Sequence, residues 1–206
     1  RQQRPRQGSL FTTSAPMPGR QKAGSAASRR GHASTTPQAA PLALPKKIQA
    51  AAADGKAGVV QTWLTGDGRA DATCVHRGVS GCTLLAIAAS KGHKQLVEVL
   101  LKRGAKPDAQ NSIGTTALMN AATSGHVQVV ETLLQHGAEI NLQDSVGCTT
   151  LMFAAHQGCE RVVDLLLRHG AEVDLQDVGG YTALTNAAFY DRPAVVLQLL
   201  RAGADM

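Results

Sequence analysis

Acidic side chains are missing from the first part of the chain. Residues 1–45 contain seven basic side chains and neither Asp nor Glu, whereas residues 46–206 contain 14 basic and 15 acidic side chains. The formal net charge of +6 therefore divides into +7 for the first segment and −1 for the rest. A domain that binds nucleic acid carries a basic patch or stripe. We therefore expect nucleic acid to be at most a weak partner, held through the basic segment.

Cysteine is also scarce, and the four cysteines do not form a C-x-x-C pair. Cys82 and Cys148 stand in equivalent positions of a sequence repeat, two repeats apart. Stacked helices lie ~8–10 Å from each other, so these two sulfurs should be ~20 Å apart. A disulfide requires Cα atoms within ~7 Å. We therefore expect reduced thiols in an intracellular, most simply cytoplasmic, protein.

The sequence also lacks a membrane-spanning run and the common catalytic signatures, which limits the classes of function to consider. No apolar run approaches the ~20 residues that a membrane-spanning helix needs, so we expect a soluble chain. The G-x-S-x-G, H-E-x-x-H and Gly-rich phosphate-loop signatures are absent as well. We therefore predict that the chain is not an enzyme, uses no cofactor and binds no small-molecule substrate.

Residues 1–42 are rich in Arg, Gln, Ser, Thr, Pro, Gly and Ala, and they show neither a helical nor a strand period. Such a segment buries too little apolar surface to offset the entropy lost on ordering, so we predict a disordered basic tail. Two roles stay open for this tail. It is either a plain linker or an organellar targeting segment, and the absence of an apolar face favours the linker.

A 33-residue period governs the rest of the chain. Self-similarity at a fixed period of this length indicates a stacked repeat protein. The period begins at Gly81 and defines the units 81–113, 114–146, 147–179 and 180–206, the last one incomplete.

Each unit contains the signals of two short helices. A Thr in the third position can cap the first helix, and an Ala pair lets the two helices approach closely. A Gly breaks the first helix, Leu and Val recur at helical spacing in the second, and another Gly ends it. The capping residues are Thr83, Thr116, Thr149 and Thr182; the turn glycines are Gly92, Gly125 and Gly158; the inward pairs include Leu133 and Leu134.

Residues 44–80 are typical of a degenerate first unit. Two helices are expected, from Lys46 to Ala53 and from Ala57 to Thr65, and the loop from Gly66 to Ser80 is four residues longer than in later units. A divergent terminal repeat is what caps a solenoid. We therefore place one repeat domain at 43–206. Four side chains of the second helix are expected to face inward: Val59, Val60, Trp63 and Leu64.

These units resemble ankyrin repeats, strongly over residues 81–206 and weakly over 44–80. The resemblance implies an all-α fold, an ankyrin-repeat α-solenoid with a helix-turn-helix and a β-turn finger in each 33-residue unit. The family's T-P-L-H tetrapeptide reads T-L-L-A, T-A-L-M, T-T-L-M and T-A-L-T here. The missing His implies the loss of a tie between neighbouring repeats.

The resemblance also implies where a partner binds, since ankyrin repeats usually contact other proteins through the finger tips and the exposed side of the first helix. Three of the chain's six aromatic residues are among the implied contact positions of the last unit. They are either anchors of an interface or contacts for a following repeat. The implied positions are Ser112, Ile113, Thr115, Thr123, Ser124, Ser145, Val146, Cys148, His156, Gln157, Val178, Tyr181, Phe189 and Tyr190.

The seven histidines do not predict a metal site. His93 and His126 share one repeat position, and His136 and His169 share another. Equivalent positions lie ~8–10 Å apart, whereas zinc ligands each sit ~2 Å from one ion. We expect turn residues here and no metal.

Three asparagines invite separate interpretations. Asn120 and Asn186 replace apolar residues, and we expect structural amides that bridge neighbouring repeats rather than ligand contacts. Asn141 resembles a site that an asparaginyl hydroxylase modifies on ankyrin repeats. The alternative, which we favour, is that Asn141 bonds its own loop.

We expect a non-catalytic protein–protein interaction module or scaffold, whose partner binds the concave face made by the fingers and inner helices. The alternative is a regulatory or targeting ankyrin segment of a larger enzyme whose catalytic domain lies outside this chain. We also expect Met206 not to end the fold, because Leu197 replaces an outward acid and leaves an apolar face for further repeats or a partner to cover. That face would also include Val195, Val196, Leu199 and Leu200.

Overall fold

The computed structural model describes residues 43–66, 68–76 and 78–205. Within these ranges it contains ten helices and one pair of short strands. The predicted disordered tail, residues 1–42, lies outside the described residues.

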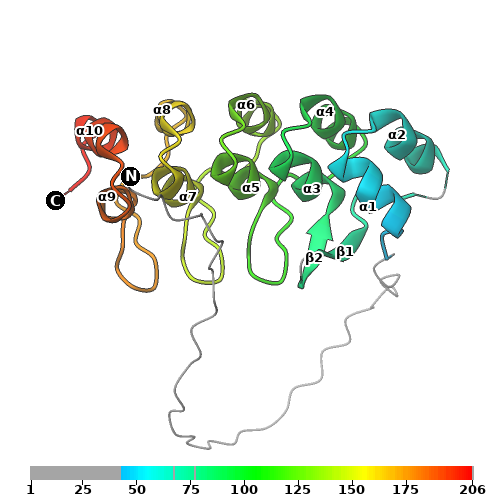
Figure 1. Ribbon diagram of the computed structural model, residues 1–206, viewed down its shortest axis with the longest axis horizontal. Helices are drawn as coiled ribbons and strands as arrows, with labels where there is room; N and C mark the ends of the chain where they lie inside the picture. The colour runs from blue at the N-terminus through cyan, green and yellow to red at the C-terminus, as the bar shows by residue number, and fades with distance from the viewer. Residues whose placement is uncertain (1–42, 67, 77, 206) are drawn as a thin grey trace, which may run out of the picture. The chain divides into compact units, whose positions relative to one another are not determined.

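The helices come in consecutive pairs and stand in two rows (Figure 1). The first helix of each pair lies in one row and the second in the other, while the connecting fingers extend from the side of the first row. The pairs are α1 (Lys46–Ala53) with α2 (Ala57–Thr65), α3 (Leu84–Ser90) with α4 (Lys94–Lys102), α5 (Ala117–Thr123) with α6 (Val127–Gln135), α7 (Thr150–Gln157) with α8 (Glu160–Arg168), and α9 (Ala183–Phe189) with α10 (Pro193–Arg201).

We call the first helix of each pair the inner helix. In every pair but the first, the inner helix begins directly after the predicted threonine. The Oγ1 atom of Thr83 accepts a hydrogen bond from the backbone amide of Ala86 at 3.1 Å, which satisfies one of the free amides of α3. Thr116, Thr149 and Thr182 accept the equivalent bond at the starts of α5, α7 and α9. The prediction of these four helix starts is confirmed.

The turn between the two helices of a unit requires a left-handed residue. Gly92, Gly125 and Gly158 supply it with φ angles of 75°, 71° and 74°. Asp191 takes this place in the last unit, with φ at 54°, and it is the one residue other than Gly with a positive φ among the described residues. The sequence pattern did not predict a strained aspartate there.

The core lies between the two rows and consists mainly of the predicted Leu, Val and Ala side chains, with further apolar residues such as Ile48, Ile87 and Met152. Leu133 is fully buried, as predicted, whereas Leu134 is half-buried. In α2 the prediction was wrong for Val59, which is 40% exposed while Val60 is fully buried. Consecutive residues on a helix point about 100° apart. In the described part of the chain α2 has a neighbouring repeat on one side, through α4, and leaves Val59 exposed, whereas α6 lies between α4 and α8 and buries both Val129 and Val130.

The longer loop of the first unit forms a hairpin that we did not predict. Strand β1 (Thr73–His76) pairs antiparallel with β2 (Val79–Thr83), with a bulge between Cys74 and His76. β-branched residues favour this structure, and the extra length lets the segment turn back on itself. The hairpin takes the place that a finger has in later units (Figure 1).

Helix α10 is less exposed than we expected. Val195 and Leu199 are buried within the last unit, so the prediction of an open apolar face was wrong for these two residues. Leu197, 54% exposed, and Leu200, 38% exposed, are the large apolar side chains that do face outward.

Candidate protein-interaction surface

The tip of each finger is held by one side-chain oxygen. The Oδ1 atom of Asn111 accepts hydrogen bonds from the backbone amides of Ile113 at 3.0 Å and Thr115 at 2.9 Å. Asp144 and Asp177 occupy the same position in the next two units and accept the equivalent pairs at 2.8 to 3.0 Å. Asn and Asp side chains stabilise turns in this way. The tip backbone is therefore fixed, and its outer side chains stay available for contacts.

Neighbouring finger tips are also bonded to each other. The amide of Ser112 donates to the carbonyl of Ser80 at 2.9 Å, and the amide of Val178 donates to the carbonyl of Val146 at 3.0 Å. The Nε2 atom of Gln143 adds a second link by donating to the carbonyl of Gln176 at 3.0 Å. The fingers therefore form one continuous hydrogen-bonded surface.

Exposed apolar side chains lie on these fingers and at the C-terminal end of the inner helix α9. Of the ten large apolar side chains that are exposed in the described part of the chain, six lie here, and all six were predicted contact residues. We call this set the finger face. It consists of Ile113 (47% exposed), Val146 (49%), Val178 (81%), Tyr181 (55%), Phe189 (79%) and Tyr190 (41%).

The other predicted contact residues are less uniform. Ser112, Ser124, Ser145 and Gln157 are exposed, whereas Thr115, Thr123, Cys148 and His156 are half-buried. Thr123 uses its hydroxyl within its own helix, donating to the carbonyl of Met119 at 2.8 Å. Burial, together with the charges of Asp144 and Asp177, raises the pKa of the Cys148 thiol to about 11. Cys148 is therefore a protonated, weakly polar contact at neutral pH.

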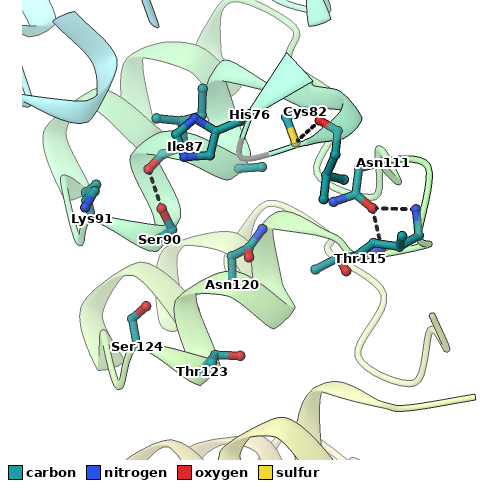
Figure 2. Close-up of a pocket in the computed structure, with 13 residues that line it drawn as sticks. His76, Cys82, Ile87, Ser90, Lys91, Asn111, Thr115, Asn120, Thr123 and Ser124 are labelled. Atoms are coloured by element: carbon teal, nitrogen blue, oxygen red, sulfur yellow. Dashed lines mark hydrogen bonds between the residues drawn. The ribbon is translucent and has the colours of Figure 1, made fainter. Parts of the chain in front are cut away.

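A groove of about 410 Å³ opens between the hairpin, α3 and α5 (Figure 2). Four predicted residues line it: Ile113, Thr115, Thr123 and Ser124. The sequence did not single out the wall on the opposite side, which includes His76, Val79, Cys82, Ser90 and Lys91. Ser90 and Lys91 stand one repeat before Thr123 and Ser124. Their positions in the period were the signal that could have identified them.

The far end of the finger face is aromatic. The ring centroids of His156 and Tyr190 are 3.8 Å apart, and those of Phe189 and Tyr190 are 5.0 Å apart, both pairs meeting edge to face. Burial, and then the charge of Arg192, lower the pKa of His156. The imidazole is therefore neutral at neutral pH and adds to an uncharged aromatic surface.

Comparison with protein families identifies the repeats. The family model for ankyrin repeats, in three copies, matches residues 48–144 and 136–206. The chain belongs to the ankyrin repeat family. Ankyrin repeats are generally protein–protein interaction modules and are typically non-catalytic. No curated protein matches the sequence.

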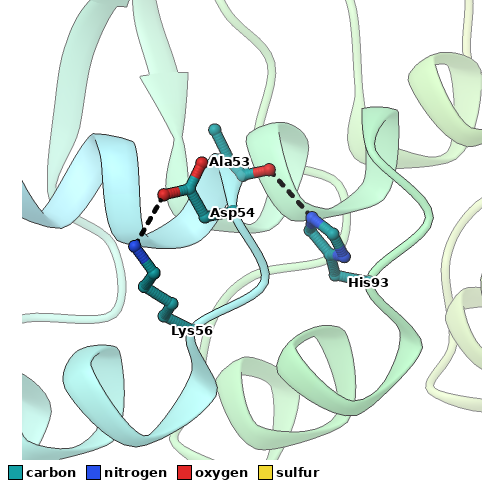
Figure 3. A network of polar contacts seen from close by, with 4 residues as sticks. All are labelled: Ala53, Asp54, Lys56 and His93. Atoms are coloured by element: carbon teal, nitrogen blue, oxygen red, sulfur yellow. Dashed lines mark hydrogen bonds and ion pairs between the residues drawn. The ribbon is translucent and has the colours of Figure 1, made fainter.

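Neighbouring ankyrin repeats are tied by other histidines, since the His of the T-P-L-H tetrapeptide is absent. The Nε2 atom of His93 donates to the carbonyl of Ala53 in the preceding repeat at 2.8 Å (Figure 3). His126 makes the equivalent bond to the carbonyl of Ser90 at 3.3 Å. Arg192, in the same position of the last repeat, donates from Nε to the carbonyl of His156 at 3.1 Å. The residue after the turn therefore links the repeats in place of the His of the T-P-L-H tetrapeptide.

Asn120 and Asn186 do not bridge neighbouring repeats as we predicted. The Nδ2 atom of each donates to the carbonyl of the capping threonine four residues earlier, at 3.1 Å to Thr116 and 3.0 Å to Thr182. The amide reaches this carbonyl more easily than the next repeat because both groups lie on one turn of the same helix.

Asn141, in contrast, does bridge two repeats. Its Oδ1 atom accepts from the backbone amide of Glu172 at 3.0 Å, and its Nδ2 atom donates to Oε1 of the same residue at 2.8 Å. The expectation that Asn141 bonds its own loop was therefore wrong. Asp108 accepts an equivalent bond from Glu139 at 2.9 Å, which makes this a recurring inter-repeat contact. Hydroxylation of Asn141 stays a hypothesis.

The described residues contain no group of three or more His, Cys, Asp or Glu side chains that could hold a metal ion. His136 uses its Nδ1 atom to donate to the carbonyl of Thr132 at 2.9 Å. In the part of the chain that the structure describes, no helix is both long and apolar enough to cross a membrane.

Proposed function

We propose that this chain is a non-catalytic recognition module that binds another protein through the finger face and the adjoining groove. The observation that carries the proposal is the combination of a fixed backbone with exposed apolar side chains. The finger tips are bonded internally and to one another, and Ile113, Val146 and Val178 project from them.

Rigidity matters because a partner need not order the fingers when it binds. Immobilising loops and rotamer-rich side chains on binding costs free energy, so a surface that is already ordered keeps more of its contact energy as affinity. Tyr and Phe supply large contact areas and are enriched at the energetic centres of interfaces. The aromatic end of the finger face therefore has the composition of an anchor site.

The charge of the repeats favours a protein over a nucleic acid. Residues 46–206 carry 14 basic and 15 acidic side chains, and the finger face itself consists of uncharged residues. A nucleic-acid interface would instead present clustered Lys and Arg to the phosphates. Among the described residues that line the groove, Lys91 is the one Lys, Arg, Asp or Glu.

A pair of matched variants tests the proposal. Val146→Asp introduces a charge at a finger tip, and Val59→Asp introduces the same charge at a comparably exposed valine on α2. Proteins captured by the wild-type chain should be lost with Val146→Asp and retained with Val59→Asp, as measured by quantitative affinity capture. Equal thermal midpoints and circular dichroism of the two variants would show that the fold is intact. Loss with Val59→Asp but not with Val146→Asp would overturn the assignment of the surface.

A further inference from the structure

Two cysteines face each other across the hairpin of the first repeat. Cys74 on β1 is the direct partner of Cys82 on β2, and both are free thiols. Directly opposed residues of an antiparallel pair have Cα atoms ~4.5–5.5 Å apart and side chains on one face of the ribbon. A disulfide spans Cα separations of ~4.4–6.8 Å. The backbone therefore already holds these two residues at the spacing of a disulfide.

Both thiols are largely buried, with Cys82 8% and Cys74 9% exposed, but they differ in whether they line the groove. Cys82 lines the groove, where its Sγ atom donates to the carbonyl of Val79 at 3.4 Å (Figure 2). Cys74 does not line that groove and is 9% exposed. Burial, and then the neighbouring Cys82, raise the pKa of Cys74. A small oxidant that enters the groove therefore meets Cys82 first.

We propose that Cys74 and Cys82 form an oxidation site, at which a peroxide converts the two thiols into an intramolecular disulfide that a dithiol reduces again. The inference does not depend on the proposed function. It adds a covalent state to the hairpin that forms one wall of the groove.

Hydrogen peroxide supplies the oxidising equivalents. The Cys82 thiolate attacks one peroxide oxygen, the O–O bond breaks, and the leaving hydroxide takes up a proton as water, which leaves a sulfenic acid on Cys82. The Cys74 sulfur, as thiolate, then attacks the Cys82 sulfur. The S–S bond forms, the S–O bond breaks, and a second water leaves. Two thiols and one hydrogen peroxide thus give one disulfide and two waters.

The second step is favoured by the position of Cys74. A group held beside its target reacts at a far higher effective concentration than a free thiol in solution. The disulfide would also end the donation of Cys82 to Val79 and join the two strands next to Thr83, which caps α3. Oxidation is therefore expected to slow hydrogen exchange in the hairpin, and to alter the groove wall that carries His76 and Val79.

The test uses the whole wild-type chain. The protein is treated with a few equivalents of hydrogen peroxide at low concentration, quenched with acid, denatured in an alkylating agent and digested for mass spectrometry. The expected product is a peptide pair in which Cys74 and Cys82 are joined, with the loss of two hydrogen atoms. Dithiothreitol should restore alkylation of both. Cys148 and Cys159 serve as internal controls and should stay alkylated.

Two variants, each with one cysteine replaced, distinguish a specific reaction of this pair from non-specific oxidation of thiols. In Cys74→Ser the reaction should stop at the sulfenic acid of Cys82, which dimedone traps. In Cys82→Ser, Cys74, which does not line the groove, should remain a thiol under the same treatment. Complete alkylation of both wild-type cysteines, direct conversion of Cys82 to a sulfinic acid, or a disulfide to Cys148, Cys159 or a second chain would each overturn the proposal.

Discussion

A Cβ atom added to Gly92 would lie 2.7 Å from Nδ1 of His126 in the following repeat. Gly55 and His93 stand in the same relationship, with the nearest approach at 2.6 Å. The turn glycine therefore meets two requirements. It adopts a left-handed φ, and it leaves room for the ring that ties the next repeat to this one.

The energetic costs of the backbone strain and of the contact with the His ring can be measured separately. Gly137 has a φ of 81° and no neighbour within 4 Å of an added Cβ, so Gly137→Ala probes the backbone strain alone, about 1–2 kcal/mol. Gly92→Ala should cost about 1 kcal/mol more, because the displaced ring of His126 also loses its hydrogen bond. Chemical denaturation gives both values. Equal losses of unfolding free energy in the two variants would show that the contact with His126 does not add to the cost of Gly92→Ala.

Cys159 interrupts the series of inter-repeat ties. It occupies the position of His93, His126 and Arg192, and its sulfur lies 3.3 Å from the Cβ position of Gly125. We expect Cys159→His to add a bond to the carbonyl of Thr123 and to stabilise the fold by about 0.5–1.5 kcal/mol. His126→Ala is the complementary control and should destabilise it. A lower denaturation midpoint for Cys159→His would contradict the prediction.

The repeating positions explain how much of this fold the sequence could predict. Thr83 and its equivalents cap helices because a short periodic pattern fixes both the helix start and the residue that satisfies its amides. The hairpin at Cys74 and Cys82 broke the period, so no neighbouring unit indicated its strands. Asn120 was also misjudged, because residue identity alone does not choose between a bond within the helix and one across repeats.

The surface was partly predictable for the same reason. Ile113, Val146 and Val178 were named from their places in the finger, and all three are exposed. His76 and Val79, which also line the groove, were missed because the sequence does not show that the hairpin forms one of its walls. That wall depends on a tertiary contact of the one irregular loop, which local patterning does not encode.

Asp191 is strained in the place where earlier repeats have glycine. Its φ of 54° is unfavourable for a side chain with a Cβ atom. We expect Asp191→Gly to stabilise the last repeat by about 0.5–1 kcal/mol, since Asp tolerates this region better than most residues. Thermal denaturation should show the gain. Asp191→Ala, which keeps a Cβ atom without a polar group, should show a loss.

Leu133 and Leu134 provide a test of the packing. Leu133 is fully buried, so Leu133→Ala should cost about 2–5 kcal/mol through lost transfer free energy and the cavity left behind. Leu134 is half-buried at the edge of the same core, and its replacement by Ala should cost about 1–2 kcal/mol. The two free energies of unfolding, measured in urea, should keep this order. The reverse order would contradict the burial of α6.

The pKa of Cys148, raised to about 11, predicts a slow thiol at the edge of the finger face. An ordinary cysteine thiol has a pKa near 9.0, so the thiolate fraction at neutral pH falls about 100-fold. The more basic thiolate is also the better nucleophile, which returns a factor of about 10. Alkylation in the folded protein should therefore be at least about tenfold slower than in the denatured chain, and its rate should rise with pH until about 11.

Asp144→Asn separates the causes of this shift. Asn111 shows that an amide oxygen can hold the finger tip in the same way as Asp144, so the turn should survive while the charge is removed. The pKa of Cys148 should then fall, but only part of the way towards 9.0, because burial is the largest cause of the increase. The midpoint of the alkylation rate against pH reports this value directly. A midpoint unchanged in Asp144→Asn would mean that the charge of Asp144 does not contribute to the shift, and a midpoint near 9.0 in the wild-type chain would show that the thiol is not buried as the structure places it.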